Sequence, residues 1–356
     1  MSLKILALTR YDQTGASSRV RFLQYIPHLE RMGARIAVKP LFPRAYLTRL
    51  YEGQSRAPFM VISAMFRRFW KSIRESDADI IWLQREMLPF APFALENLLL
   101  GTRKLVLDLD DAHHLYYKNH PSWLGRVSYK TKVDALIKRA SAVVVGNPTL
   151  AEYAQAVGAS NVHGVPSAVD VSRFKSGGNK TSDVFQVGWI GTPVTANQSL
   201  PLIREPLLRF LSNFNATCVL IGVGENQFPE IPATRVAWSE AAEEKYLPRL
   251  SVGLCPLDNT PWNRGKSGYK INQYMASGKP TLVSPVGIAE RMISHGNTGF
   301  HCLISDDWYS HLVALYKNTD FRASMGRQAA VEAEAKYDTA SAAAALHRIF
   351  QECANG

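Results

Sequence analysis

The sequence predicts an α/β fold with two parallel sheets, and three observations predict it. Short apolar runs alternate with amphipathic segments along the whole chain, which is typical of repeated βα units. The 356 residues exceed the size at which one hydrophobic core keeps growing, so two domains are expected. A polar, glycine-containing stretch, VSRFKSGGNKTSD at 171–183, interrupts the pattern near the middle and is the predicted linker.

The first predicted domain spans residues 1–170. Its apolar runs predict five strands, with helices between them, because runs of this length bounded by polar residues suit buried strands of a parallel sheet. The predicted strands are 4–8, 36–40, 80–83, 104–108 and 142–145.

The second predicted domain spans residues 184–338 and repeats the pattern. From residue 306 onward the sequence is almost wholly helical, and we expect a terminal helix over 339–356 that packs back on the first domain. The predicted strands are 185–190, 217–221, 235–238, 252–255, 281–283 and 300–303.

Charge and cysteine content narrow the classes of partner and compartment. The formal charge of +11 favours anionic partners, namely nucleic acid, acidic lipids or phosphorylated small molecules. We expect no nucleic acid, because the sequence shows no helix-turn-helix, RNA-recognition or zinc-finger pattern. The four cysteines lie far apart and form no CxxC pair, and the N-terminus has no apolar signal stretch. A cytoplasmic protein is therefore predicted.

The segment RGKSGYKINQYMASGKPTLVSPVGIAE, 264–290, predicts a helix followed by a strand. Ser267 or the adjacent glycine is expected to open the helix, and three cations, Arg264, Lys266 and Lys270, lie around its start. Free N–H groups and cations at a helix N-terminus favour a diphosphate. The alternative is a basic, solvated loop before an ordinary helix.

The same segment resembles the donor-binding motif of family 4 glycosyltransferases of the GT-B fold, in the bacterial subgroup that reads K-x-G-[FY]-K-x-x-Q-Y-M-A-x-G-x-P. WIGTPVTANQSL at 189–200 resembles the first strand and loop of that subgroup's donor domain. LQREMLPF at 83–90 and LVLDLDDAHHL at 105–115 resemble elements of its acceptor domain. The motifs occur in the expected order over most of the chain.

This resemblance implies two Rossmann-like domains that face each other across a cleft. It implies transfer of a sugar from a UDP-, GDP- or dTDP-sugar, held by the C-terminal domain, to a hydroxyl of an acceptor held by the N-terminal domain. Retention of anomeric configuration, no metal and no other cofactor are implied too. The acceptor would be a cell-envelope glycan or a lipid-linked intermediate of polysaccharide biosynthesis.

The resemblance also assigns donor-binding residues, with departures from the wider family. Gln273 and Gly265 stand where two glutamates are common, so the ribose contact falls to the Gln273 amide. The phosphate-neutralising role falls to the three cations named above. Glu290 would contact the ribose or sugar, or else be a first-turn carboxylate favoured by the helix dipole. The remaining donor contacts implied are Gly191 and Thr192, with Gly15 and Ala16 from the first domain.

Gly15 and Ala16 lie in RYDQTGASSR, the loop after the first strand, which in the GT-B fold faces the donor phosphates. Gly15 is expected to supply backbone freedom, with Ser17, Ser18 and Arg19 beginning the next helix. A plain Gly-Ser helix cap is the alternative.

An acidic cluster with two histidines follows the predicted strand 104–108, and three interpretations compete. Asp108 and Asp110 could hold a metal, as Asp-x-Asp does in the unrelated GT-A fold. Asp110 or Asp111 could act as a general base toward the acceptor hydroxyl, with His113 contacting the donor sugar. Alternatively, the aspartates cap a turn. The cluster consists of Asp108, Asp110, Asp111, His113 and His114.

Two further regions are candidates for binding. Arg85 and Glu86 follow a strand and would either bind an anionic acceptor group or pair with each other. The stretch 56–74 interleaves apolar and basic residues, which suits either the surface of an anionic membrane or a core helix with a solvated basic face. We therefore expect a protein that can lie peripherally on the inner face of the cell membrane.

Three other functions compete with the transferase. A GT-B sugar-nucleotide epimerase would act on the donor alone and need no acceptor. A basic nucleic-acid-binding protein would explain the charge. A dinucleotide oxidoreductase is disfavoured because IGVGENQF at 221–228 lacks the third glycine of the fingerprint.

Overall fold

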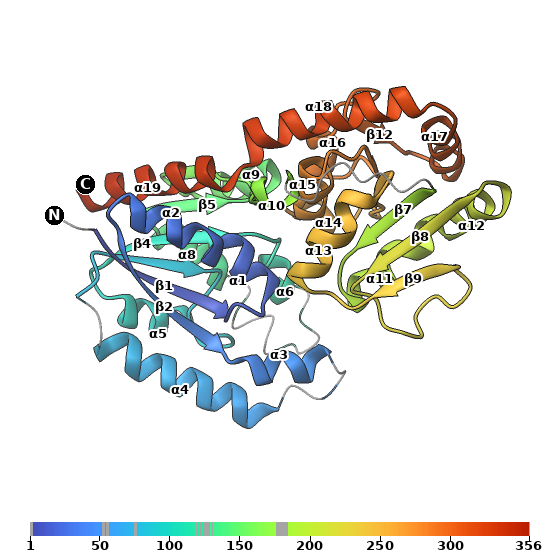
Figure 1. Ribbon diagram of the computed structural model, residues 1–356. Coiled ribbons are helices and arrows are strands. Elements are labelled where there is room, and N and C mark those ends of the chain that lie inside the picture. The colour runs from blue at the N-terminus through green and yellow to red at the C-terminus, as the bar shows by residue number, and fades with distance from the viewer. Residues whose placement is uncertain are drawn as a thin grey trace. The chain divides into compact units, whose positions relative to one another are not determined.

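A computed structural model describes residues 3–355 apart from 52–53, 55–56, 75–76, 119, 121–122, 124–128, 130 and 176–183. Its contacts divide the chain into two compact units. The first unit comprises 1–167, 265–267 and 339–356, and the second comprises 168–264 and 268–338. Each unit is built on one six-stranded parallel sheet (Figure 1). The predicted fold class is confirmed.

The sheet of the first unit has the strand order β2-β1-β3-β4-β5-β6. Every residue of β3 and β5 is buried, as expected for strands covered by helices on both faces. The strands are β1 (Lys4–Tyr11), β2 (Arg35–Phe42), β3 (Ile80–Gln84), β4 (Lys104–Leu109), β5 (Ala142–Val145) and β6 (Val162–Gly164).

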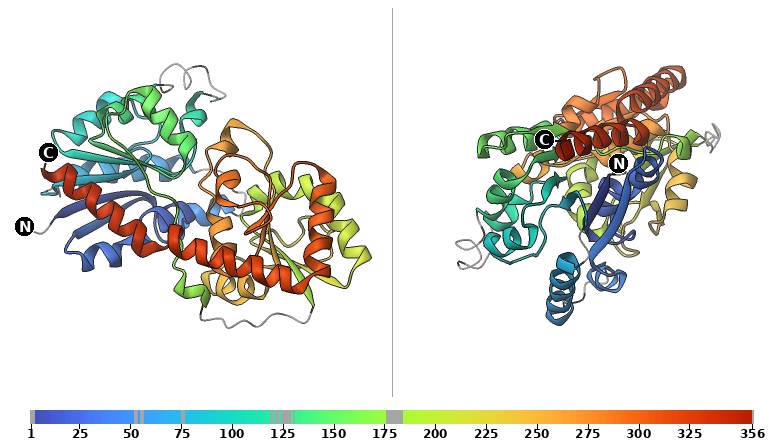
Figure 2. Two further views of the ribbon diagram at one scale, coloured as in Figure 1. Left: turned by 90° about the horizontal axis from the view of Figure 1, so that it is seen from above. Right: turned by 90° about the vertical axis from the view of Figure 1, so that its left-hand side faces the viewer.

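Helices from both ends of the chain cover this sheet. The terminal helix α19 runs along this unit (Figure 2) and contacts α2, β3 and β4. Its Phe350 ring lies 5.2 Å, between centroids, from the buried Trp82 ring. The helices of this unit are α1 (Ala16–Arg21), η1 (Leu23–Tyr25), α2 (Ile26–Arg31), α3 (Arg44–Tyr51), α4 (Pro58–Arg74), α5 (Phe93–Leu100), α6 (His114–Lys118), α8 (Lys132–Arg139), α9 (Pro148–Val157) and α19 (Thr339–Asn355).

The sheet of the second unit has the order β12-β11-β10-β7-β8-β9. Its strands are β7 (Phe185–Ile190), β8 (Ala216–Ile221), β9 (Ala233–Val236), β10 (Val252–Cys255), β11 (Thr281–Val283) and β12 (Gly299–His301). Its helices are α10 (Ser172–Lys175), α11 (Pro193–Ser199), η2 (Leu200–Ile203), α12 (Arg204–Asn213), α13 (Glu240–Tyr246), η3 (Leu247–Arg249), α14 (Pro261–Arg264), α15 (Tyr269–Ala276), α16 (Ile288–Met292), α17 (Ser305–Lys317) and α18 (Thr319–Tyr337).

Helix α15 is fixed against this sheet by one tyrosine and one glycine. The Tyr274 hydroxyl accepts a hydrogen bond from the Ile190 amide at 3.0 Å and donates to the Leu254 carbonyl at 3.3 Å. A Cβ at Gly253 would lie 2.3 Å from the Tyr274 ring, so only glycine leaves room for it. Ile271, Tyr274 and Met275, which share one side of this helix, are all fully buried.

Several predicted boundaries are wrong, and the causes are local. The strand predicted at 235–238 is β9, two residues earlier, and the strand predicted at 300–303 is β12, one residue earlier and shorter. β6 was not predicted, because three residues with a single apolar side chain make no readable pattern. The predicted linker begins with α10, whose Phe174 is buried, and residues 176–183 lie outside the described part of the chain.

The strand order reverses once in each sheet. It reverses between β1 and β3 in the first unit and between β7 and β10 in the second. In open α/β sheets, ligands bind at the carboxyl edge beside such a reversal. These two edges are therefore where site residues are expected.

Candidate active site

Glu86 is the centre of a buried network at the carboxyl edge of the first sheet. Its carboxylate accepts hydrogen bonds from Arg10 Nη1 at 3.3 Å, Tyr117 Oη at 2.7 Å and Lys132 Nζ at 2.8 Å. His113 Nε2 lies 3.1 Å from Oε1. Glu86, His113 and Lys132 are all at least nine-tenths buried. The carboxylate is thus surrounded by donors from β1, α6, α8 and the turn before α6.

This network sets the ionisation of its members. Burial alone would raise the pKa of Glu86, but the Lys132 charge and the His113 hydrogen bond hold it well below its ordinary value. Burial lowers the pKa of His113, so its imidazole is neutral at pH 7. Because Glu86 is ionised, Nε2 of His113 carries the proton and donates it, which leaves Nδ1 as an acceptor.

A second network holds the acidic cluster. Arg85 binds Asp110 with two hydrogen bonds, of 2.7 and 3.0 Å, and Asp111 with one of 2.8 Å. Arg85 adopts a φ of 64°, which non-glycine residues rarely occupy, and its amide donates to the Asp108 carbonyl at 3.0 Å. Burial opposes ionisation of Asp110, but the Arg85 charge lowers its pKa. Burial, then the Asp110 charge, raises the pKa of Asp111 to about 6.

The Asp108 carboxylate is also paired with a guanidinium group. Arg21 contacts both of its carboxylate oxygens at 2.9 Å and donates to the Val165 carbonyl at 2.6 Å. Both carboxylates that the metal interpretation would use, Asp108 and Asp110, are therefore bound by guanidinium groups. Among the described residues, no group of three or more His, Cys, Asp and Glu side chains could hold a metal ion.

The pairing predicted between Arg85 and Glu86 is wrong, because the two side chains join different networks. Successive residues of an extended chain point to opposite sides, and Arg85 also turns into the left-handed region. Arg85 contacts the aspartates after β4, whereas Glu86 contacts Lys132 and Tyr117. Sequence reasoning missed Arg10, Arg21, Tyr117 and Lys132, and no local motif marks them.

The loop after β1 is close to these groups. Ser18 Oγ donates to the Gln84 side chain at 2.7 Å and accepts from the Tyr11 amide at 3.0 Å, which ties the loop to β3. Helix α1 begins at Ala16, one residue before the predicted start, with Gly15 as N-cap. Gly15 has a φ of −84°, so the predicted backbone freedom is not what it supplies. A Cβ there would lie 2.3 Å from Tyr11 Cβ, so glycine is needed for space.

The corresponding edge of the second sheet is built from glycines and amides. Gly191 follows β7, and its Cβ position would lie 2.3 Å from the Trp189 ring. Gly222, with a φ of 79°, lies against the Gly191 carbonyl. Thr192 caps α11 and forms a capping box with Thr195. The structure thus places Gly191 and Thr192 at the reversal of strand order.

Two of the predicted donor-binding residues lie on α15 beside this edge. Lys270 Nζ stands 4.2 Å from the centroid of the buried Trp189 ring, which directs the cation to the end of β7. Gln273 is buried, and its Nε2 has no hydrogen-bond partner. A buried amide without a partner is costly unless a ligand or water satisfies it.

The other predicted donor contacts are divided between the two units. Arg264 Nε donates to Asn259 Oδ1 at 2.7 Å. Lys266 belongs to the first unit, where its carbonyl accepts from Asn147 Nδ2 at 3.1 Å. Glu290 is exposed in the first turn of α16. Helix α15 begins at Tyr269, and its N-cap is Gly268 with a φ of 69°, so Ser267 does not cap it.

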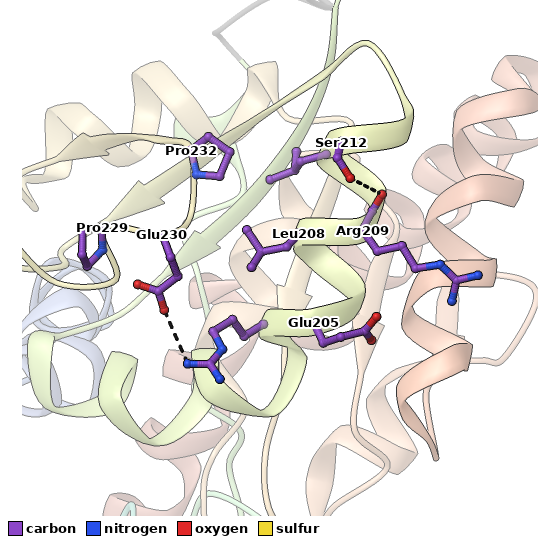
Figure 3. A pocket seen from close by; sticks show the side chains of 9 residues that line it. Glu205, Leu208, Arg209, Ser212, Pro229, Glu230 and Pro232 are labelled. Carbon is purple, nitrogen blue, oxygen red and sulfur yellow. Dashed lines mark hydrogen bonds and ion pairs between the residues drawn. The ribbon is translucent and has the colours of Figure 1, made fainter.

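A separate cavity of about 690 Å³ lies between α12 and the turn before β9 (Figure 3). Its charged side chains pair among themselves or with neighbours: Arg204 contacts Glu230 at 3.7 Å, and Arg209 contacts Asp306 at 3.4 Å. None of the predicted site residues lines it. It is not the candidate site.

The sequence matches no family model and no curated protein. The structure is similar to HepE of Anabaena in complex with UDP, with a TM-score of 0.69 and 14% identity over 98% of this chain and 100% of that one. It has the fold of glycosyltransferases. A glycosyltransferase from Rickettsia africae matches with a TM-score of 0.69 and 12% identity over 99% and 98% of the two chains.

A third similar structure is sucrose-phosphate synthase from Thermosynechococcus elongatus, with a TM-score of 0.67 and 13% identity over 98% of each chain. The structure of HepE in complex with UDP-glucose is similar to this chain as well, with a TM-score of 0.68 and 15% identity. These likenesses extend over both units, so this chain shares its fold with these structures along nearly its whole length. No helix in the described residues combines the length and apolarity needed to cross a membrane.

Proposed function

We propose that the protein is a glycosyltransferase that moves a sugar from a nucleoside-diphosphate sugar to a hydroxyl of an acceptor. The observation that carries the proposal is the shared fold over 98% of the chain with an enzyme solved with UDP and with UDP-glucose. Chemistry at the carboxyl edge of each sheet supports it independently.

The second unit is proposed to hold the donor. At its carboxyl edge, Lys270 supplies a cation and Gln273 supplies a buried amide without a partner. The backbone amides of Gly191 and Thr192 already donate to the Ile221 carbonyl and to Thr195 Oγ1, so these two residues shape the loop. The Lys270 cation and the Gln273 amide suit a pyrophosphate and a ribose hydroxyl, and the cation neutralises the charge that develops on the leaving phosphate. Arg264, Lys266 and Glu290 are proposed as further donor contacts. No metal is required in this scheme, because cations and N–H groups take its place.

The first unit is proposed to hold the acceptor and to handle its proton. Asp111 is the best candidate for the general base, since its raised pKa of about 6 makes it a stronger base than Asp110 while leaving it ionised at pH 7. His113, fixed through Nε2 by Glu86, is proposed to accept a hydrogen bond from a donor-sugar hydroxyl at Nδ1. Retention of configuration is proposed from the resemblance alone.

The acceptor is proposed to be a cell-envelope glycan or a lipid-linked intermediate, modified at the cytoplasmic face of the membrane. The basic charge of +11 and the exposed apolar side of α4 support a lipid-linked acceptor over a soluble one.

Thermal denaturation with a panel of ligands tests the donor assignment. UDP, GDP, dTDP and CMP, each with a matching sugar nucleotide, are compared at about 100 times Kd, where a true ligand adds about 2.7 kcal/mol of stability. For a chain of this length that shift corresponds to about 3–4 °C. No shift with any nucleotide would refute the proposal. Conversion of the donor to its epimer without an acceptor would identify an epimerase instead.

A further inference from the structure

Helix α4 presents two opposite faces of very different character. Its inner face includes the buried Ala64 and Arg68, and Met65 packs against the main core of the first unit. Arg68 Nη2 donates to the carbonyls of Thr9 and Lys39, at 2.6 and 2.7 Å. These bonds to β1 and β2 fix which side of the helix faces the protein.

The outer face of α4 is an exposed apolar ridge. Phe59 is 88% exposed, Ile62 63%, Phe66 65% and Trp70 47%. Spacings of three and four residues place these four side chains on one side of the helix, opposite Arg68. The interpretation of this stretch as a core helix with a solvated basic face holds only in part. Met65 and Phe69 pack against the core and Arg67 is exposed, but Arg68 is buried and the four side chains of the ridge are exposed.

Four large apolar side chains in one exposed row are unusual for a protein surface in contact only with water. Elsewhere in the described chain, exposed large apolar residues such as Leu98, Val194 and Val331 stand singly on their elements. The described part of the chain leaves these four side chains exposed, so the ridge is a candidate surface for contact with another molecule.

The surroundings of the ridge are basic. Residues 35–74 contain Arg35, Lys39, Arg44, Arg49, Arg56, Arg67, Arg68, Lys71 and Arg74 but only one acid, Glu52. Arg44 and Arg67 are exposed. Arg56 and the side chains of 71–74 lie outside the described part of the chain and enter only through composition. An apolar row within a basic surface matches an anionic bilayer, which offers acyl chains below phosphate groups.

We infer that α4 lies in the interface of an anionic phospholipid membrane, with Phe59, Ile62, Phe66 and Trp70 among the acyl chains and Arg67 at the headgroups. This inference deepens the proposed function, on which it rests only for its purpose, namely access to a lipid-linked acceptor. The membrane contact itself needs no nucleotide.

Vesicle sedimentation tests the inference directly. The whole protein is mixed with phosphatidylcholine vesicles that contain about 30 mol % phosphatidylglycerol or none, at low and high salt. We expect binding to the anionic vesicles at low salt and at least about tenfold weaker binding to the neutral ones. Equal binding to both, or none to either, would overturn the inference.

Substitutions distinguish binding through the ridge from nonspecific binding by any exposed apolar side chain. Phe59→Gln with Phe66→Gln should weaken vesicle binding about 100-fold, because two aromatic side chains no longer enter the apolar layer. The matched control, Leu303→Gln with Val331→Gln, changes residues 79% and 64% exposed in the second unit and should leave binding unchanged. Arg67→Glu should weaken binding about 30-fold, whereas Arg327→Glu on α18 should change it less than threefold.

A fluorescent label distinguishes insertion from other occupants of the ridge. The four native cysteines are buried, so an environment-sensitive dye attached to Ile62→Cys is selective. We expect a blue shift of its emission with anionic vesicles and no shift for the dye on Val331→Cys. A blue shift without lipid, together with a dimer that the double Phe variant abolishes, would assign the ridge to a second copy of this chain and overturn the inference.

The two proposals fail separately. Vesicle binding is measured without nucleotide, and nucleotide stabilisation is measured without lipid. If the protein does not bind vesicles but nucleotides still stabilise it, only the proposed membrane contact is refuted.

Discussion

Each of the two sheets has one reversal of strand order, but the side chains at the two carboxyl edges differ in their chemistry. In the first unit, Glu86 and Asp108 are each paired with a buried cation, and Asp110 is paired with the partly buried Arg85. In the second unit, the edge has glycines, amides, Lys270 over an indole ring and the unpartnered amide of Gln273. The first edge is completed by its own ion pairs, whereas at the second the buried Gln273 Nε2 has no partner among the described residues. The difference supports a division in which one unit positions an acid–base group and the other binds an anion.

Glu86→Gln should give the largest effect. The variant keeps the shape but removes the charge that Lys132 and Arg10 face in a buried site, so about 3–5 kcal/mol of unfolding free energy should be lost. Urea denaturation measures it. Glu244→Gln is the matched control, because Glu244 pairs with Arg173 at 2.8 Å while 47% exposed, and it should cost at most about 1 kcal/mol.

The same pair of proteins gives a pH test. Because the folded-state pKa of Glu86 is lowered, its stabilisation is fully present above the unfolded value of about 4.3 and is lost as pH falls through the folded value. The stability gap between wild type and Glu86→Gln should therefore be constant from pH 7 to about 5 and close only in stronger acid. A gap that closes near neutral pH would contradict the buried ion network.

Lys270→Met should affect ligand binding instead of folding. Removal of one charge-assisted contact worth about 1.5–3 kcal/mol should weaken nucleoside-diphosphate binding about 10- to 150-fold. The methionine still covers the Trp189 ring, so the unfolding free energy should change by less than about 1 kcal/mol. Titration calorimetry measures the affinity. Lys317→Met, on the exposed end of α17, is the control, and an equal loss of affinity there would remove Lys270 from the donor site.

Asp111 should give the pH dependence of the reaction. With a pKa of about 6, raised by burial and by Asp110, the carboxylate is the base only above that pH. We expect kcat/KM to fall about tenfold per pH unit below about pH 6 and to level off above it. Asp306→Asn, at an exposed carboxylate, should keep this profile. Asp111→Asn should lower the plateau and lose the slope, and a slope retained in that variant would assign the base elsewhere.

These predictions also show what the sequence can and cannot determine. Buried strands such as β5, β7 and β10 were predicted to the residue, because an apolar run between polar ends is a local signal. The pairing of polar side chains, in contrast, depends on residues that lie far apart in the sequence. Arg85 meets the acidic cluster because Gln84 is in register with Asp108, and Lys132 reaches Glu86 from a helix 46 residues along the chain. Periodicity located both faces of α4, but it could not tell which of them the sheet would cover.

Glu290→Gln should give the smallest effect and decides between two interpretations of one exposed carboxylate. If Glu290 accepts a hydrogen bond from the donor, the neutral amide keeps the contact but loses its charge assistance, and affinity for the nucleotide sugar should fall about fivefold. Glu240 is the matched control, since it is another exposed first-turn carboxylate, at the start of α13. If only the helix dipole matters, Glu290→Gln and Glu240→Gln should each cost a similar few tenths of a kcal/mol of stability, and neither should change affinity. Calorimetry on both variants separates the cases, because a ligand contact changes the affinity at one position whereas a dipole contribution changes the stability at both.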